Sequence, residues 1–168
     1  MDKLRIVSVD SDDKIDIVVT LAKEIWNQHF TPIIGPAQVT YMLDKFQSYS
    51  AIKKQIQEGY KYFLMDYDNT PVGYSGVHEE DGRLFLSKIY IKENCRGKGI
   101  SSAVIDFYVS LCRNRNLSKI WLTCNKNNYN SIAAYEHMGF VTVRTQVADI
   151  GHGYVMDDVI MEKPITTI

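Results

Sequence analysis

The segment Arg96-Gly97-Lys98-Gly99-Ile100-Ser101-Ser102 combines two glycines and two cations at the start of a helical pattern. Glycines let a backbone turn tightly and approach a ligand closely. The free N–H groups and the dipole of a helix N-terminus favour a bound anion. Arg96 and Lys98 add positive charge. The segment therefore predicts a loop that binds a pyrophosphate group.

Two common classes of pyrophosphate ligand do not suit this loop. A nucleoside triphosphate loop needs G-x-x-x-x-G-K-[ST], which is absent, and a dinucleotide fingerprint needs a glycine where Ser102 stands. The fingerprint also needs an acidic residue about 20 positions later, which binds the ribose. Residues 107–135 contain no Asp or Glu. Both ligand classes are therefore disfavoured.

The loop instead resembles a known family motif. Arg96-x-x-Gly99-x-Ser101 is similar to R/Q-x-x-G-x-G/A, the pyrophosphate loop of the GNAT superfamily of acyl-CoA-dependent N-acyltransferases. Ser101 departs from the usual Gly or Ala, but serine is small and its hydroxyl can donate to a phosphate. Residues 128–140, which run from Asn128 to a closing Gly139-Phe140, resemble a second motif of the family. The resemblance covers about residues 84–140.

This resemblance implies a site and a donor, acetyl-CoA, used as a co-substrate. The backbone N–H groups of residues 97–102 would bind the pyrophosphate, with Arg96 and Lys98 beside it. Backbone atoms of the Ile89-Tyr90-Ile91 strand would pair with the pantetheine arm, and Asn128 would contact the cofactor. The N–H of Ile89 would stabilise the oxyanion. Tyr135 would be the acid that protonates the leaving thiolate, because a phenol pKa near 10 lies above that of a thiol. The cofactor-binding residues are then Ile89, Tyr90, Ile91, Arg96, Gly97, Lys98, Gly99, Ile100, Ser101, Ser102 and Asn128.

Other roles remain open for the last two residues. Without the motif, Tyr135 would be a packed aromatic on an amphipathic helix. Asn128 stands in a segment rich in asparagine, which turn and helix-cap chemistry would also produce. The general base is unassigned, since the strand before the loop has Ser87-Lys88 where some family members have a glutamate. His29, His78, Glu24, Glu79 and Tyr74 are candidates by residue type alone.

Periodicity and turn residues predict a mixed α/β fold in one domain, residues 1–168. The resemblance implies a GNAT-like, mostly antiparallel twisted sheet, with one parallel βαβ pair splayed around the cofactor and helices on both faces. Apolar residues from Ile100 to Cys112 recur at helical spacing, which gives the strongest helix in the sequence. We expect strands at 4–9, 60–67, 72–78, 84–92, 120–124, 140–147 and a last one through 161; a helix to about 28; one or two helical stretches ending at Gly59; a helix from about 101; and a short helix at about 132–138.

Composition narrows the partners. The net charge of −1 gives no argument for nucleic acid or a membrane surface. No run approaches the roughly 20 apolar residues of a membrane helix, and the first residues do not resemble a signal peptide, so we expect a cytoplasmic protein. The three cysteines and four histidines lack ligand spacing, so no metal site is expected.

The resemblance implies an acetyl-CoA-dependent N-acetyltransferase that acts on the primary amine of a small molecule by direct attack in a ternary complex. The layout is loosely similar to that of polyamine acetyltransferases, and acidic residues would attract such an acceptor. A protein amino group, or a non-catalytic role as an acyl-CoA-binding sensor, remains an alternative. The resemblance also leaves a homodimer open.

Overall fold

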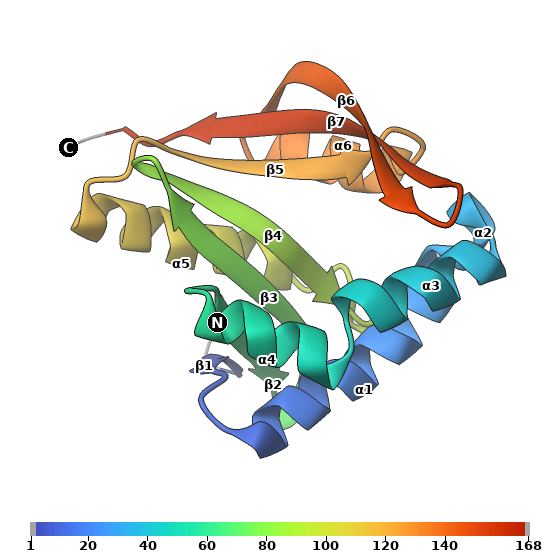
Figure 1. Ribbon diagram of the computed structural model, residues 1–168. Coiled ribbons are helices and arrows are strands. Elements are labelled where there is room, and N and C mark those ends of the chain that lie inside the picture. Colours follow the sequence, from blue (N-terminus) through green and yellow to red (C-terminus); the bar gives the residue numbers. More distant parts are fainter. Residues whose placement is uncertain (1–2, 167–168) are drawn as a thin grey trace. The chain divides into compact units, whose positions relative to one another are not determined.

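The computed structural model describes residues 3–166, which form two compact units (Figure 1). The first unit contains residues 3–78 and 88–104, and the second contains residues 79–87 and 105–166. Strand β4 (Arg83–Ile91) begins in the second unit and ends in the first, whereas helix α5 (Ile100–Arg115) begins in the first and ends in the second. The strands are hydrogen-bonded in the order β1-β2-β3-β4-β5-β7-β6.

The first unit packs helices and antiparallel strands around an apolar core. Strand β1 pairs with β2, and β2 with β3, in antiparallel registers. Ile25, Val39 and Ile52, from three different helices, are at most 1% exposed. The elements of this unit, besides the shared β4 and α5, are β1 (Leu4–Ser8), α1 (Asp12–His29), α2 (Thr31–Ile34), α3 (Pro36–Phe46), α4 (Tyr49–Gln57), β2 (Lys61–Tyr67), β3 (Thr70–Glu80, whose last two residues lie in the second unit) and the short 3₁₀ turn η1 (Glu93–Cys95).

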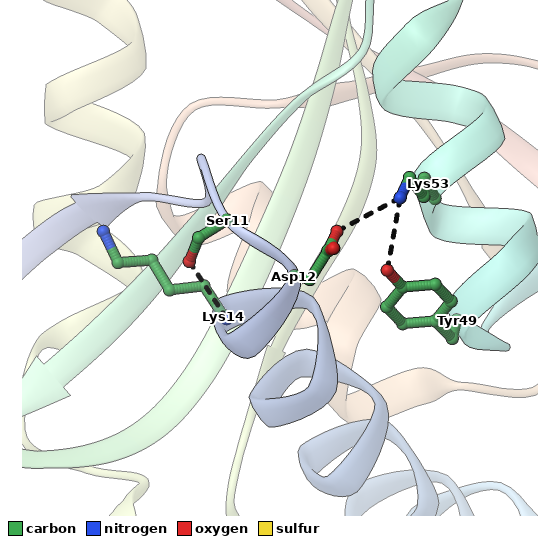
Figure 2. Close-up of polar contacts among 5 residues, drawn as sticks. All are labelled: Ser11, Asp12, Lys14, Tyr49 and Lys53. Atoms are coloured by element: carbon green, nitrogen blue, oxygen red, sulfur yellow. Dashed lines mark hydrogen bonds and ion pairs between the residues drawn. The ribbon is translucent and has the colours of Figure 1, made fainter.

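Polar contacts hold the start of α1 (Figure 2). The Ser11 hydroxyl accepts the Lys14 N–H at 3.4 Å, which satisfies one of the donors left free at a helix start. Lys53 of α4 lies 3.2 Å from the Asp12 carboxylate and donates to the Tyr49 hydroxyl at 3.3 Å. The Tyr49 and Lys53 hydrogen bonds lower the pKa of Asp12. These contacts join α1 to α4.

The second unit contains the parallel strand pair. Leu84 and Phe85 of β4 pair in parallel with Ile120 and Trp121 of β5. Strand β7 pairs antiparallel with both β5 and β6. The elements of this unit, besides the shared ones, are β5 (Lys119–Asn125), α6 (Tyr129–His137), β6 (Val141–Gly151) and β7 (Tyr154–Pro164).

The predicted mixed α/β fold is confirmed, with β4–β5 as the parallel pair within a mostly antiparallel arrangement. Most predicted boundaries lie within a residue or two of the observed ones. Four differ more: α6 begins at Tyr129, β6 continues to Gly151, β7 continues to Pro164, and residues 31–34 form a separate short helix. No helix among residues 3–166 is long and apolar enough to cross a membrane.

Candidate functional site

The predicted phosphate loop is an exposed turn between η1 and α5. Gly97 and Gly99 have φ values of 79° and 76°, in the left-handed region that favours glycine. A Cβ added to either glycine would meet no atom within 4 Å. The backbone at both positions is therefore open to a ligand, as the binding of a pyrophosphate group would require.

Helix α5 begins at the end of this loop. The Gly99 carbonyl accepts the N–H of Ala103 at 3.1 Å, so the helix starts one residue before the predicted Ser101. Ile100 is 2% exposed and anchors the first turn, whereas Ser102 is exposed. The first N–H groups of an α-helix have no intrahelical acceptor. An anion at the loop would therefore meet free donors and the positive end of the helix dipole.

The loop's cations are available for a ligand. Arg96 and Lys98 are exposed, and within residues 3–166 neither forms an ion pair. Lys98 Nζ lies 5.2 Å from the centroid of the Tyr67 ring. The nearby Lys92, in contrast, is paired with Glu24 of α1 at 3.2 Å. Within the described part of the chain, no ion pair therefore neutralises the positive charge of the loop.

The end of β4 holds the residues predicted to bind pantetheine. The Tyr90 ring packs against Trp26 and Tyr74, with centroids 5.5 Å away in both cases. Gly73 of β3 lies so close that an added Cβ would be 2.4 Å from the Tyr90 carbonyl oxygen. The Tyr90 side chain therefore anchors the strand, and Ile91 is buried beside it. A cofactor role would fall to the backbone.

Asn128 and Tyr135 lie together in the second unit, on and just before α6. Asn128 is 6% exposed, and its carbonyl accepts the Ile132 N–H at 3.1 Å at the helix start. Tyr135 is half-buried and its ring lies 5.6 Å from that of Phe140. The Phe140 N–H donates to the Tyr135 carbonyl at 3.0 Å, so the closing Gly-Phe folds back on the helix end. The loop and the β4 residues 89–91 are thus grouped in one unit, and Asn128 and Tyr135 in the other.

Comparison with known proteins decides the family. Residues 21–140 match the Acetyltransferase (GNAT) family, which is more than half of the chain. The chain belongs to the GNAT acetyltransferase family. The resemblance predicted from the loop and from residues 128–140 is thereby confirmed.

Individual GNAT relatives agree with this assignment. The uncharacterized N-acetyltransferase YjgM of Escherichia coli (strain K12) is 26% identical over 100 residues, which span 57% of this chain and 60% of that protein. The crystal structure of PaiA N-acetyltransferase from Thermoplasma acidophilum in complex with coenzyme A superposes with a TM-score of 0.81 at 17% identity, over 96% of this chain and 98% of that one. A chimera of spermidine N-acetyltransferase SpeG from Vibrio cholerae and hSSAT gives 0.71 at 20% identity, over 96% and 95%. The structural likenesses confirm the GNAT fold.

The candidates for a general base in this GNAT chain all have structural partners. These are Glu24 with Lys92, His29 with Phe30, Tyr74 with Gln47, His78 with Tyr60, and Glu79 with Arg115. Tyr74 is fully buried and its pKa is raised well above the ordinary value, chiefly by burial. Each of the five therefore has a packing or pairing role that accounts for it without catalysis.

The structure instead draws attention to Lys88, which the sequence marks only as a missing carboxylate. Lys88 is 6% exposed, and its Nζ donates to the Phe46 carbonyl and to Gln55 Oε1, both at 3.0 Å. It also hydrogen-bonds the Tyr62 hydroxyl, which donates to Gln55 Oε1 at 2.6 Å. Burial lowers the pKa of Lys88 to about 7. Lys88 thus ties β4 to β2, to α4 and to the end of α3.

Proposed function

We propose that the chain is an acetyl-CoA-dependent N-acetyltransferase that acetylates a primary amine of a small molecule. The observation that carries this proposal is the loop at residues 96–99. Its two left-handed glycines leave open space, it precedes a 16-residue helix, and its cations are not paired within the described chain. Family membership supports the pyrophosphate of an acyl-CoA as the expected anion.

In this proposal the backbone N–H groups of residues 97–102 bind the donor's pyrophosphate, and Arg96 and Lys98 supply charge. The backbone of Ile89, Tyr90 and Ile91 pairs with the pantetheine amides as an added strand would. The neighbour crystallised with coenzyme A supports this assignment of the donor. Asn128 is the further contact assigned from the family motif.

The chemistry is a direct acyl transfer. The neutral amine attacks the thioester carbonyl, a C–N bond forms, and the C–S bond breaks as the intermediate collapses. The N–H of Ile89 stabilises the transient oxyanion. Tyr135 gives its proton to the departing thiolate and recovers one from the nitrogen, which sheds a proton as the amide forms. Free coenzyme A and the N-acetyl amine are the products.

A small cationic amine is the proposed acceptor. The spermidine acetyltransferase chimera has the same fold over nearly the whole chain, which supports a polyamine as the first compound to try. At 20% identity the likeness concerns the fold, so other amines belong in the same assay.

The test is coenzyme A release, measured by thiol titration, from acetyl-CoA with a panel that contains spermidine, an aminoglycoside and amino acids. Wild-type protein should release coenzyme A only when an accepted amine is present. Tyr135→Phe should lower kcat by about 10²-fold or more, as expected for the loss of a general acid. Tyr129→Phe is the matched control, because Tyr129 lies on the same helix and is 73% exposed.

A second pair of variants tests the loop. Gly99→Asp places a carboxylate where the pyrophosphate is expected and should abolish acetyl-CoA binding by calorimetry. Gly82→Asp is its control, since Gly82 has a similar φ of 75° and equally open surroundings in the turn before β4. Equal acetyl-CoA affinity in both variants would refute the donor site. Tight binding by the wild type without turnover of any amine would refute the transferase and favour an acyl-CoA sensor.

A further inference from the structure

Asp158 of β7 is a buried carboxylate that no other described residue neutralises. It is 5% exposed, and within residues 3–166 its carboxylate forms neither a hydrogen bond nor an ion pair. Burial, with a smaller contribution from the charge of Asp157, raises the pKa of its carboxyl to about 6. Ionised groups in such surroundings are costly unless a partner is present. A group of this kind calls for a functional explanation.

The position of Asp158 in the sheet is informative. It pairs with Asn125, the last residue of β5, and β5 is the strand that runs parallel to β4. In open α/β sheets, ligands bind outside the carboxyl ends of the parallel strands, and Asn125 is the carboxyl end of β5. After Asn125 the chain continues through Asn128 into α6, which contains Tyr135. Asn128 and Tyr135 are the two residues already assigned from the family motif. Asp158 thus stands at the strand end that leads to them.

Within residues 3–166, no charged neighbour forms an ion pair with Asp158. On its own strand Asp157 is paired with Lys126, 2.5 Å away, so this lysine is engaged. On β5 the adjacent Cys124 has its pKa raised to about 12, by burial and by the charge of Asp158. On β6 the residue opposite is Gln146, and the nearby Arg144 is exposed and forms no ion pair with Asp158. The described chain therefore supplies no cation to this carboxylate.

We propose that Asp158 binds the ammonium group of the acceptor amine and takes its proton before attack on the thioester. The inference rests on the proposed function and supplies the general base that the sequence leaves unassigned. The ammonium N–H bond breaks, its proton moves to the carboxylate oxygen, and the nitrogen lone pair becomes the nucleophile. After product release the carboxylic acid returns the proton to solvent. The site thus selects amines that arrive as cations.

The experiment compares Asp158→Asn with Asp157→Asn, the exposed-side neighbour that is paired with Lys126. The measurements are kcat/KM from pH 5 to 9, with spermidine or the panel amine that wild-type protein turns over fastest, and acetyl-CoA affinity by calorimetry. Asp158→Asn should lower kcat/KM by about 100-fold or more and remove the fall in activity below about pH 6. Its acetyl-CoA affinity should stay within about twofold of wild type, because the pyrophosphate loop is unchanged. Asp157→Asn should keep the fall in activity at low pH, moved slightly to lower pH, because the charge of Asp157 helps to raise the pKa of Asp158.

The two proposals fail in different ways. An active wild-type protein whose Asp158→Asn variant keeps its rate and pH profile would overturn this inference alone. Equal losses in Asp158→Asn and Asp157→Asn would overturn it too, since they would indicate a general change in the β5–β7 strand pair. Absence of amine-dependent turnover in the wild type would overturn the transferase itself. Asparagine has the shape of aspartate and removes an unpaired buried charge, so the variant is expected to fold, which a melting curve checks.

Discussion

The burial of Lys88 predicts a measurable pH dependence of the free energy of unfolding. Its pKa falls from 10.5 to about 7 because burial disfavours the charged form. In the unfolded chain the lysine keeps its proton up to about pH 10.5. Between these two pH values the unfolded state therefore binds the extra proton, and the free energy of unfolding should rise with pH. Below about pH 7 both states are protonated and Lys88 gives no slope.

The magnitude follows from the shift of 3.5 pH units between 10.5 and about 7. Each unit corresponds to 1.36 kcal/mol, so the contribution is about 5 kcal/mol over the full interval, or about 1.4 kcal/mol per pH unit. The hydrogen bonds around Nζ oppose this effect. Lys88, Tyr62, Gln55 and the Phe46 carbonyl make four contacts that need four hydrogens, three from an ammonium and one from the Tyr62 hydroxyl. A neutral amine leaves one contact without a hydrogen.

The assay is urea unfolding of wild type and Lys88→Met at several pH values from 6 to 10. Methionine keeps the length of the side chain without charge or donors, and the difference between the two curves cancels the titration of all other groups. That difference should grow in favour of wild type as pH rises above about 7. Lys53→Met is the control, because Lys53 is 43% exposed and its pKa is raised, so it should add no slope in this range.

A difference that stays constant from pH 6 to 10 would refute the reasoning. It would mean that the three oxygen acceptors compensate the burial of the ammonium completely. A slope of the opposite sign would mean that they overcompensate it.

Two further predictions concern the β4 end and the acid on β7. Gly73→Ala should lower the free energy of unfolding by about 1–3 kcal/mol and weaken acetyl-CoA binding, because the new Cβ would lie 2.4 Å from the Tyr90 carbonyl oxygen. Chemical denaturation and calorimetry measure these two effects. The control is Gly82→Ala, whose Cβ would lie in open space and should leave acetyl-CoA affinity unchanged. Asp158→Asn should raise the free energy of unfolding at pH 8 by up to about 3 kcal/mol, because the pKa of Asp158 is raised from 3.8 to about 6 and its ionised form is therefore unfavourable in the folded state. Urea unfolding curves should show that this gain shrinks as the pH falls towards 4. A difference that does not depend on pH would contradict the prediction.

Local signals made much of the fold predictable from the sequence. The apolar spacing from Ile100 to Cys112 and the two loop glycines specify a helix and its start without information from distant residues. The parallel pair followed from one strand, one helix and one strand in succession. Boundaries failed where local preferences are weak, as in the asparagine-rich start of α6 and the mostly exposed strand β6.

The significance of Lys88 and Asp158 could not be predicted in the same way. A lysine that follows a serine in a strand is typical of an exposed position, and nothing nearby in the sequence indicates that Phe46, Gln55 and Tyr62 surround it. Asp158 stands beside Asp157 in the sequence, yet one is paired with Lys126 and the other is buried. Burial and partners are tertiary properties, so these residues emerge only from the folded chain.

Lys88 and Asp158 have opposite surroundings at nearly equal exposure, 6% and 5%. Three oxygen acceptors face the amine of Lys88, so the protein itself supplies the hydrogen-bond partners of this group and a structural role accounts for the residue. No group of the described chain satisfies Asp158, so its charge is a cost that folding alone does not explain. Functional sites commonly keep such costs, and relieving them stabilises the protein while activity is lost. A more stable Asp158→Asn variant that no longer turns over an amine would therefore identify the carboxylate as part of the acceptor site, whereas a structural acid would lose stability on the same change.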